Sequence, residues 1–138
     1  MGYAKEITKE AHEKELEWIA RHVKAADIVI TSALVPGKRA PVLITEEAVR
    51  AMKPGSVIVD LAAEGGGNCA LSEPGCDVVK HGVTILARQN VPSLMPHQAS
   101  LLYARNVAGL FYEVWKKDGL HLDLENEIVK GALVTWKI

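Results

Sequence analysis

The residues of this chain that could contact a ligand come directly after three short runs of apolar residues. Each run is followed by a loop of small residues, prolines and side chains with polar oxygen or nitrogen atoms. Small residues and prolines give a ligand close access to the main chain, so these loops favour binding and orientation over acid–base catalysis. The candidate residues are Thr31, Ser32, Leu34, Pro36, Asp60, Glu64, Asn68, Gln89, Asn90 and Pro92.

Asp60 and Glu64 are the carboxylates among these candidates, and each has two interpretations. Asp60 stands where an apolar run ends, where a carboxylate commonly accepts hydrogen bonds from loop amides, so a structural role is favoured. Glu64 lies within the loop, where a solvated residue and a site residue are equally compatible with the sequence. No nucleophile–base pattern, no phosphate-binding P-loop and no His-Glu-x-x-His zinc motif occurs. We therefore expect no catalytic residue in this chain.

Gly65, Gly66 and Gly67 also permit two interpretations. Their backbone N–H groups could bind a phosphate, but no helix signal follows, and a helix terminus normally completes such a site. A tight turn that lets the backbone pack closely is therefore favoured. Cys69 and Cys76 lack the close spacing of metal-binding pairs, so free thiols are expected rather than a disulfide or a metal site.

The three apolar runs predict the strands that must position these residues. They lie at residues 27–31, 56–60 and 82–86, and each is short, rich in β-branched residues and free of interior charge. Runs of this kind are typical of strands buried on both faces. The strands are therefore expected in the interior of an α/β sheet.

Helical periodicity predicts the elements between and after the strands. Apolar residues at helical spacing predict a helix over 5–24, and Thr45 with two following glutamates predicts a short helix that stops by residue 53. A broad apolar face predicts a largely covered helix over 97–117, ended by Asp118-Gly119. The tail predicts a helix or turn at 125–130 and an edge strand at 132–138.

Strands separated by helices predict a parallel sheet with helical crossovers. Loops after parallel strands lie at the same edge of the sheet, where α/β proteins bind ligands, so residues 31–37, 60–68 and 88–93 should converge. A dinucleotide-binding unit also needs a Gly-x-Gly-x-x-Gly turn, and this chain has none. The three strands are thus expected to form one half of a doubly wound sheet.

Composition excludes several classes of function. The chain has 138 residues, 49% of them hydrophobic, and a net charge of −1 without any block of like charge. These values predict a compact globular protein with no nucleic-acid partner and no attraction to an anionic membrane surface. No apolar run approaches the roughly 18 residues of a membrane span, and no signal peptide is visible, so a cytoplasmic location is expected.

Five stretches of the sequence resemble a known family. They are residues 2–6, 27–45, 52–68, 90–93 and 99–106. Together they closely resemble the α subunit of the proton-translocating NAD(P) transhydrogenases, over essentially all 138 residues. The related alanine dehydrogenases typically carry Asp followed by Gln-Gly-Gly-Cys where this chain has Glu-Gly-Gly-Gly-Asn at 64–68, which favours the transhydrogenases.

This resemblance implies the C-terminal part of the NAD(H)-binding component, called domain I, an oxidoreductase component with NAD as its cofactor. There, NADH passes a hydride to NADP held on another component, coupled to proton translocation through a membrane part. Residues 1–95 would form the second half of an NAD-binding Rossmann-like subdomain, and 96–138 a long helix and a returning segment. The glycine fingerprint would lie upstream of Met1 or on a partner chain. The chain is then expected to be an excised piece that is inactive alone.

The resemblance also implies roles for particular residues. Gly2 and Tyr3 resemble a mobile loop that closes over bound nucleotide. Residues 31–34 (Thr31, Ser32, Ala33 and Leu34) resemble the backbone wall beside the nicotinamide, with Leu34 the foremost candidate. Asn90 and Pro92 are further cofactor-binding candidates. Glu64 aligns with a carboxylate that relatives use as an acid or base, and is expected to be structural here, because hydride transfer between two nicotinamides needs no general base.

The resemblance further implies a homodimer that works with NADP-binding and membrane components, and so a peripheral position on the cytoplasmic face of the inner membrane. Two alternatives stay open. One is a fragment of an amino acid oxidoreductase similar to alanine dehydrogenase. The other is a non-catalytic assembly module, in which the 97–117 helix and the C-terminal strand form a dimer surface.

Overall fold

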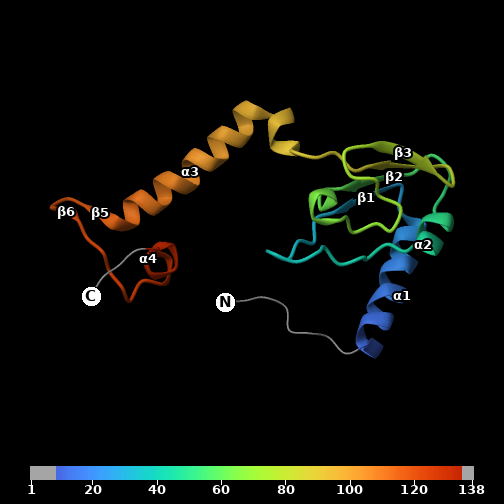
Figure 1. Cartoon of the computed structure of the whole chain (residues 1–138), viewed down its shortest axis with the longest axis horizontal. Coiled ribbons are helices and arrows are strands. Elements are labelled where there is room, and N and C mark those ends of the chain that lie inside the picture. The colour runs from blue at the N-terminus through green and yellow to red at the C-terminus, as the bar shows by residue number, and fades with distance from the viewer. Residues whose placement is uncertain (1–8, 135–138) are drawn as a thin grey trace. The chain divides into compact units, whose positions relative to one another are not determined.

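A computed structural model describes residues 9–134 of the chain, which divide into two compact units between Val91 and Pro92 (Figure 1). The first unit contains a four-stranded sheet with two helices, and the second is mainly helical. Gly2 and Tyr3 lie outside the described residues. Each unit is described below by itself.

The sheet of the first unit is mostly parallel and has the strand order β1-β2-β4-β3. Its strands are β1 (Ile28–Thr31), β2 (Val57–Asp60), β3 (Asp77–Lys80) and β4 (Val83–Leu86). β2 pairs in parallel with both β1 and β4, and Thr31 lies directly opposite Asp60. The predicted α/β class with a Rossmann-like parallel sheet is therefore confirmed, and β1, β2 and β4 are the three predicted strands.

β3 is a strand that the sequence interpretation missed. It pairs antiparallel with β4, and a two-residue turn at His81 and Gly82 joins them. Both turn residues have positive φ, 53° and 79°, as a type I′ hairpin turn requires. The connection from β2 to β4 thus runs through a short 3-10 helix, η1 (Ala63–Gly65), and β3, so the predicted helical crossover is wrong at this point.

An ion pair closes the open end of this hairpin. Arg88 Nε donates to Asp77 Oδ2 at 3.0 Å. The guanidinium hydrogen bond and charge hold the pKa of the Asp77 carboxyl below its ordinary value. The hairpin forms the edge of the sheet, and a paired charge on an edge strand discourages pairing with another chain.

Helices cover one face of the sheet. α1 (Lys9–Ala25) and α2 (Glu46–Arg50) pack against each other, and their apolar side chains join Ile58 and Ile85 of the sheet in one core cluster (Figure 1). α2 begins where predicted, since Thr45 Oγ1 accepts a hydrogen bond from the main chain three residues later.

The opposite face of the sheet is open within the described residues. Ile28 and Ile30 of β1 are 66% and 67% exposed, whereas Ile58 and Ile85 are fully buried. The expectation that the strands are buried on both faces is therefore wrong for residues 9–134. The two helices that pack on this sheet lie on one side, and alternate side chains of each strand point to the other.

The second unit is built on one long helix. After a 3-10 turn, η2 (Val91–Leu94), the elements are α3 (Pro96–Val114), β5 (Trp115–Lys116), β6 (Gly119–Leu120) and α4 (Glu127–Ala132). α3 ends three residues earlier than the predicted 117, because the chain turns into a β5–β6 hairpin at Asp118-Gly119. α4 matches the predicted helix or turn at 125–130, with Asn126 as its cap.

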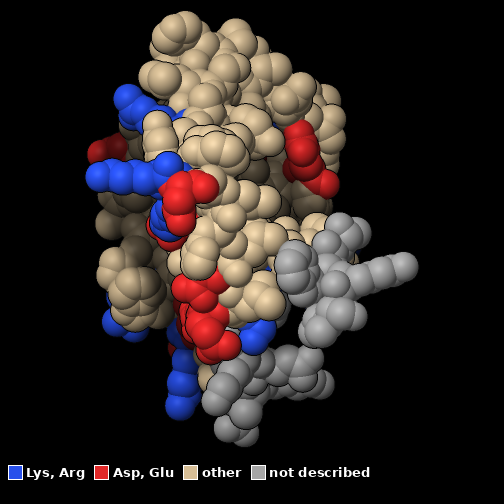
Figure 2. Space-filling model, turned by 90° about the vertical axis from the view of Figure 1, so that its left-hand side faces the viewer, with Lys and Arg blue, Asp and Glu red and all other residues tan. Residues whose placement is uncertain are grey.

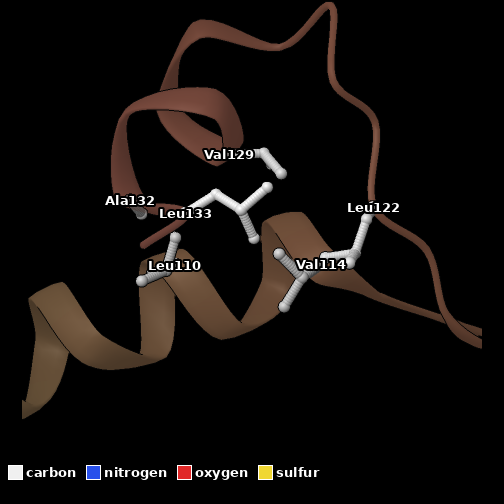
Figure 3. A pocket seen from close by; sticks show the side chains of 6 residues that line it. All are labelled: Leu110, Val114, Leu122, Val129, Ala132 and Leu133. Carbon is white, nitrogen blue, oxygen red and sulfur yellow. The ribbon is translucent and has the colours of Figure 1, made fainter. Parts of the chain in front are cut away.

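α3 is far less covered than predicted, since none of its described residues is buried. Its contact with α4 encloses a small apolar cavity of about 160 Å³ (Figure 3). The lining residues are Leu110, Val114, Leu122, Val129, Ala132 and Leu133. After α4 the chain is irregular to Val134, and the rest of the predicted edge strand lies outside the described residues.

Charge is dispersed over the surface. On the face drawn in Figure 2, acidic and basic side chains lie near one another, and a wide area carries neither. None of the helices within residues 9–134 has the length and apolar character that crossing a bilayer requires.

Candidate functional site

Asp60 organises the edge of the sheet at which β1, β2 and β4 end. It is 1% exposed, and its carboxylate accepts five hydrogen bonds. The donors are Thr31 Oγ1 at 3.1 Å, Ser72 Oγ at 2.6 Å, and the main-chain N–H groups of Ala62, Asn68 and Cys69 at 3.0, 2.8 and 3.1 Å. A buried carboxylate with this many donors holds loops in place. The structural interpretation of Asp60 therefore agrees with these contacts.

Asn68 joins the loop after β2 to the loop after β1. Its Oδ1 accepts the main-chain N–H of Ala33 at 2.9 Å, and its Nδ2 donates to the main-chain carbonyls of Ala33 at 2.9 Å and Pro41 at 2.7 Å. The Asn68 side chain is fully buried. It therefore occupies the place that a neighbouring strand would take beside Ala33.

The three glycines form a turn. The N–H groups of Gly65, Gly66 and Gly67 donate to main-chain carbonyls of Ala62 and Ala63, at 2.9 to 3.1 Å. These amides are committed to the protein, so they offer no phosphate cradle. A Cβ at Gly67 would lie 2.8 Å from Asp60 Oδ2, which explains why the turn needs glycine there.

The loops after the three parallel strands meet, as the sequence predicts. Besides the Asn68–Ala33 bonds, the Glu64 carboxylate accepts the main-chain N–H of Asn90, a residue of the loop after β4. A Cβ at Gly65 would lie 3.1 Å from Leu34 Cδ2, so Leu34 packs against the glycine turn. Leu34, Glu64 and Asn90 therefore lie at one edge of the sheet.

The structure places the predicted cofactor-binding residues in different surroundings. Thr31 is buried at the end of β1, whereas Ser32 and Leu34 are exposed, Leu34 by 58%. Asn90 is exposed and has a positive φ of 49°, which is uncommon outside glycine. Pro92 belongs to the second unit, and its place relative to this edge is not described.

Two residues of the edge escaped the sequence interpretation. Ser72 donates to Asp60, and the Arg39 side chain lies where a Cβ at Gly66 would be, 2.9 Å away. Both lie far along the chain from the residues they contact, and no local pattern marks them. A signal of this kind requires the three-dimensional structure.

Cys69 and Cys76 are free thiols, as predicted. Burial raises the pKa of the Cys69 thiol, and nearby hydrogen bonds from Leu71 and Ser72 oppose that shift. A buried thiol with a raised pKa is a poor nucleophile, which argues against a catalytic role. Within residues 9–134, no cluster of three potential metal-binding side chains occurs.

This edge suits one part of a dinucleotide and not another. The exposed side chains of Leu34 and Val35 give an apolar surface for a flat ring, beside the polar Ser32 and Asn90. The committed glycine amides leave the pyrophosphate to be bound by other residues. The arrangement can position a ring and exclude water, and it contains no acid–base pair for the chemistry itself.

Comparisons with known proteins agree with this geometry. Residues 3–137 match the family described as alanine dehydrogenase/PNT, C-terminal domain. The chain is 53% identical over 136 residues to the first of the polypeptides that make up the NAD(P) transhydrogenase subunit alpha of Rhodospirillum rubrum, covering 97% of this chain and 35% of that protein. It is 33% identical over 120 residues to the alanine dehydrogenase of Lysinibacillus sphaericus, covering 83% of this chain and 32% of that protein.

A solved structure is also similar. The crystal structure of the transhydrogenase from Sinorhizobium meliloti matches with a TM-score of 0.68 and 43% identity, covering 88% of this chain and 34% of that chain. The resemblance stated from the sequence is confirmed by these matches. The chain spans about a third of the length of the curated relatives it matches.

Proposed function

Because this chain belongs to the family of alanine dehydrogenase/PNT C-terminal domains, we propose that it forms part of the NAD(H)-binding component of an NAD(P) transhydrogenase. The component transfers a hydride between NAD(H) and NADP(H), coupled to proton translocation. The observation that carries the proposal is the convergence of the three loops at one edge of the parallel sheet, through Asp60, Asn68 and Glu64. The higher identity to a transhydrogenase subunit than to an alanine dehydrogenase, 53% against 33%, supports this choice.

In this proposal the loop edge binds the nicotinamide end of NAD(H). Bound NAD(H) supplies the hydride chemistry, and the protein orients the ring and excludes water. Residues 31–34 form the wall beside the ring, with Leu34 in apolar contact and Ser32 at its polar side. Asn90 and Pro92 border the same site, and Gly2 with Tyr3 closes over it.

The division of labour within the chain is part of the proposal. Residues 1–95 supply the second half of the nucleotide-binding subdomain, and residues 96–138 supply the long helix and the returning segment. The pyrophosphate and ribose are bound by a glycine turn and an acidic residue outside this chain. The assembled protein is a homodimer that meets NADP-binding and membrane components at the cytoplasmic face of the inner membrane.

The test is a hydride-transfer assay on the complete protein that contains this chain. NADH binding is followed by the fluorescence of the reduced nicotinamide, and transfer by reduction of an NADP⁺ analogue with a distinct absorbance. We expect binding and transfer, with Leu34→Ala lowering the transfer rate. Absence of NADH binding by the complete protein would overturn the proposal.

A second candidate is an amino acid oxidoreductase of the alanine dehydrogenase kind. The 33% identity to an alanine dehydrogenase favours it, together with a carboxylate, Glu64, at the loop edge. The same complete protein, supplied with NADH, pyruvate and ammonia, separates the two. NADH oxidation that depends on pyruvate and ammonia supports this candidate, and oxidation only with the NADP⁺ analogue supports the transhydrogenase.

A third candidate is an assembly module, favoured by the exposed apolar side chains of α3. Tyr103 and Tyr112 of this helix are 71% and 69% exposed. Exposed apolar surface of this extent marks an interface. A stable dimer in sedimentation, with no heat on titration of millimolar NADH into the chain, supports this candidate for the isolated chain.

A further inference from the structure

We propose that Asn68 is a positioning residue, which fixes the main chain of residues 31–34 against the nicotinamide ring. The inference deepens the proposed function and rests on it for its activity test. Asn68 would touch no substrate itself. Its side chain acts through Ala33, the residue between Ser32 and Leu34.

The hydrogen bonds define one orientation of the Asn68 side chain. Oδ1 accepts from the Ala33 N–H, while Nδ2 donates to the carbonyls of Ala33 and Pro41. The reversed orientation would place an NH₂ group against an N–H group, and an oxygen against two carbonyl oxygens. Both side-chain protons and one acceptor site of the amide are therefore used.

Asn68 is itself held on both sides of its main chain. Its N–H donates to Asp60 Oδ2 at 2.8 Å, and its carbonyl accepts the N–H groups of Leu43 and Ile44 at 2.8 and 3.0 Å. Asp60 in turn bonds Thr31 at the end of β1. The side chain of Asn68 is thus a fixed arm, attached to β2 through Asp60 and reaching Ala33 across 35 residues of sequence.

The place where this arm ends distinguishes positioning from stability alone. A main-chain amide and carbonyl of one residue, bonded together by a side-chain amide, have the same two-bond arrangement as a residue within a sheet. The arm therefore extends the order of β1 past Thr31 into the proposed ring wall. Misplacement of a reacting ring by about 1 Å can lower a rate by roughly 100-fold.

The activity test compares Asn68→Ala and Asn68→Leu in the complete protein. Leucine keeps the branching at Cγ and removes every hydrogen bond, so it separates bonding from loss of volume. We expect the rate of hydride transfer at saturating nucleotides to fall about 10-fold or more in both, while the Kd for NADH changes less than about 3-fold.

Ser56→Ala is the matched control. Ser56 is also a buried polar residue, 2% exposed, whose hydroxyl bonds the Ala26 carbonyl where β2 begins, away from the loop edge. Its transfer rate is expected to stay within about 2-fold of wild type. Wild-type transfer rates in both Asn68 variants would overturn the inference and leave the proposed function standing.

A second measurement needs neither activity nor a variant. In the wild-type protein, NMR should show slow hydrogen exchange at the Ala33 amide and at both side-chain protons of Asn68. In Asn68→Leu, protection at Ala33 should be lost while that of Val59 in β2 is kept. Fast exchange of the Asn68 side-chain protons, or unchanged protection of Ala33 in the variant, would overturn the inference. The proposed function fails separately, if the wild-type protein binds no NADH.

Discussion

At the level of single residues, Asp60 determines the geometry of the loop edge. Its five hydrogen bonds come from the ends of β1 and β2 and from the loop after the glycine turn. Sequence reasoning could predict its structural role, because a carboxylate at the end of a buried strand commonly bonds loop amides. It could not predict the donors, which lie up to 29 residues away in the chain.

Asp60→Ala should lower the free energy of unfolding by about 3 kcal/mol or more, because it leaves three buried main-chain N–H groups without an acceptor. Asp60→Asn should cost about 1 to 2 kcal/mol, since its NH₂ group must face at least one of these N–H groups. Denaturation by urea measures both values. Asp27→Ala is the control, because Asp27 is an exposed carboxylate that pairs with Lys53 at the surface. Equal stability of Asp60→Ala and Asp27→Ala would contradict this account.

The two cysteines should differ sharply in reactivity. Cys69 is buried and its thiol pKa is raised, so at pH 8 it should react with an alkylating reagent at least about 10-fold more slowly than the exposed Cys76. Raising the pH should increase the Cys69 rate, because more of the thiol is then ionised. Mass spectrometry of partly labelled protein gives both rates. Labelling of Cys69 as fast as Cys76 would show that Cys69 is not buried.

At the level of elements, the glycine turn and the β3–β4 hairpin show what local sequence can and cannot reveal. The strands at 27–31, 56–60 and 82–86 could be predicted, because β-branched runs without interior charge have few other structures available. β3 was missed because Asp77 and Lys80 place charges at both ends of a four-residue strand. Its turn is His-Gly rather than the familiar Asn-Gly.

The end of α3 could not be placed for a related reason. Asp118-Gly119 is a stop signal for a helix and equally a turn signal for a hairpin. The structure uses it as a hairpin turn, in which Gly119 has a φ of 121°. The cover over the helix was also misjudged, since an apolar pattern reports the side chains of an element and not its neighbours.

Two glycines with similar backbone angles offer a direct comparison. Gly67 has a φ of 81° and Gly55 a φ of 88°, but only Gly67 has an atom close to its missing Cβ, Asp60 Oδ2 at 2.8 Å. Gly55→Ala should cost about 1 kcal/mol, from the positive φ alone. Gly67→Ala should cost at least about 1 kcal/mol more, because the carboxylate must also move. Equal losses in thermal denaturation would show that the glycine turn does not press on Asp60.

At the level of the whole molecule, the apolar side chains on α3 predict self-association. Leu102 is 60% exposed, and Tyr103 and Tyr112 on the same helix are more so. Leu102→Lys should shift sedimentation from dimer towards monomer, because it places a charge in an apolar interface. Asn106→Lys adds the same charge to an exposed polar position of α3 and should leave the dimer intact. Sedimentation of the unaltered chain as a monomer would rule out this interface.

The loop edge is the feature of the whole molecule on which the proposed function depends. Its location could be predicted, since parallel strands bring the loops that follow them to one edge. Its internal bonds could not, because Asn68 and Ala33 are 35 residues apart. Sequence reasoning therefore predicted where a ligand should bind and missed the arm that shapes the site.

The most direct test of this account is NMR of the complete protein, with ¹³C-labelled leucine methyl groups, titrated with NADH. We predict nuclear Overhauser effects between nicotinamide ring protons and the Leu34 methyl groups, and shifts of the Ser32 and Asn90 amides. The amides of Gly55 and Gly82, at the opposite edge of the sheet, should stay unchanged. Shifts at Gly55 and Gly82 with none at Leu34 would contradict the account.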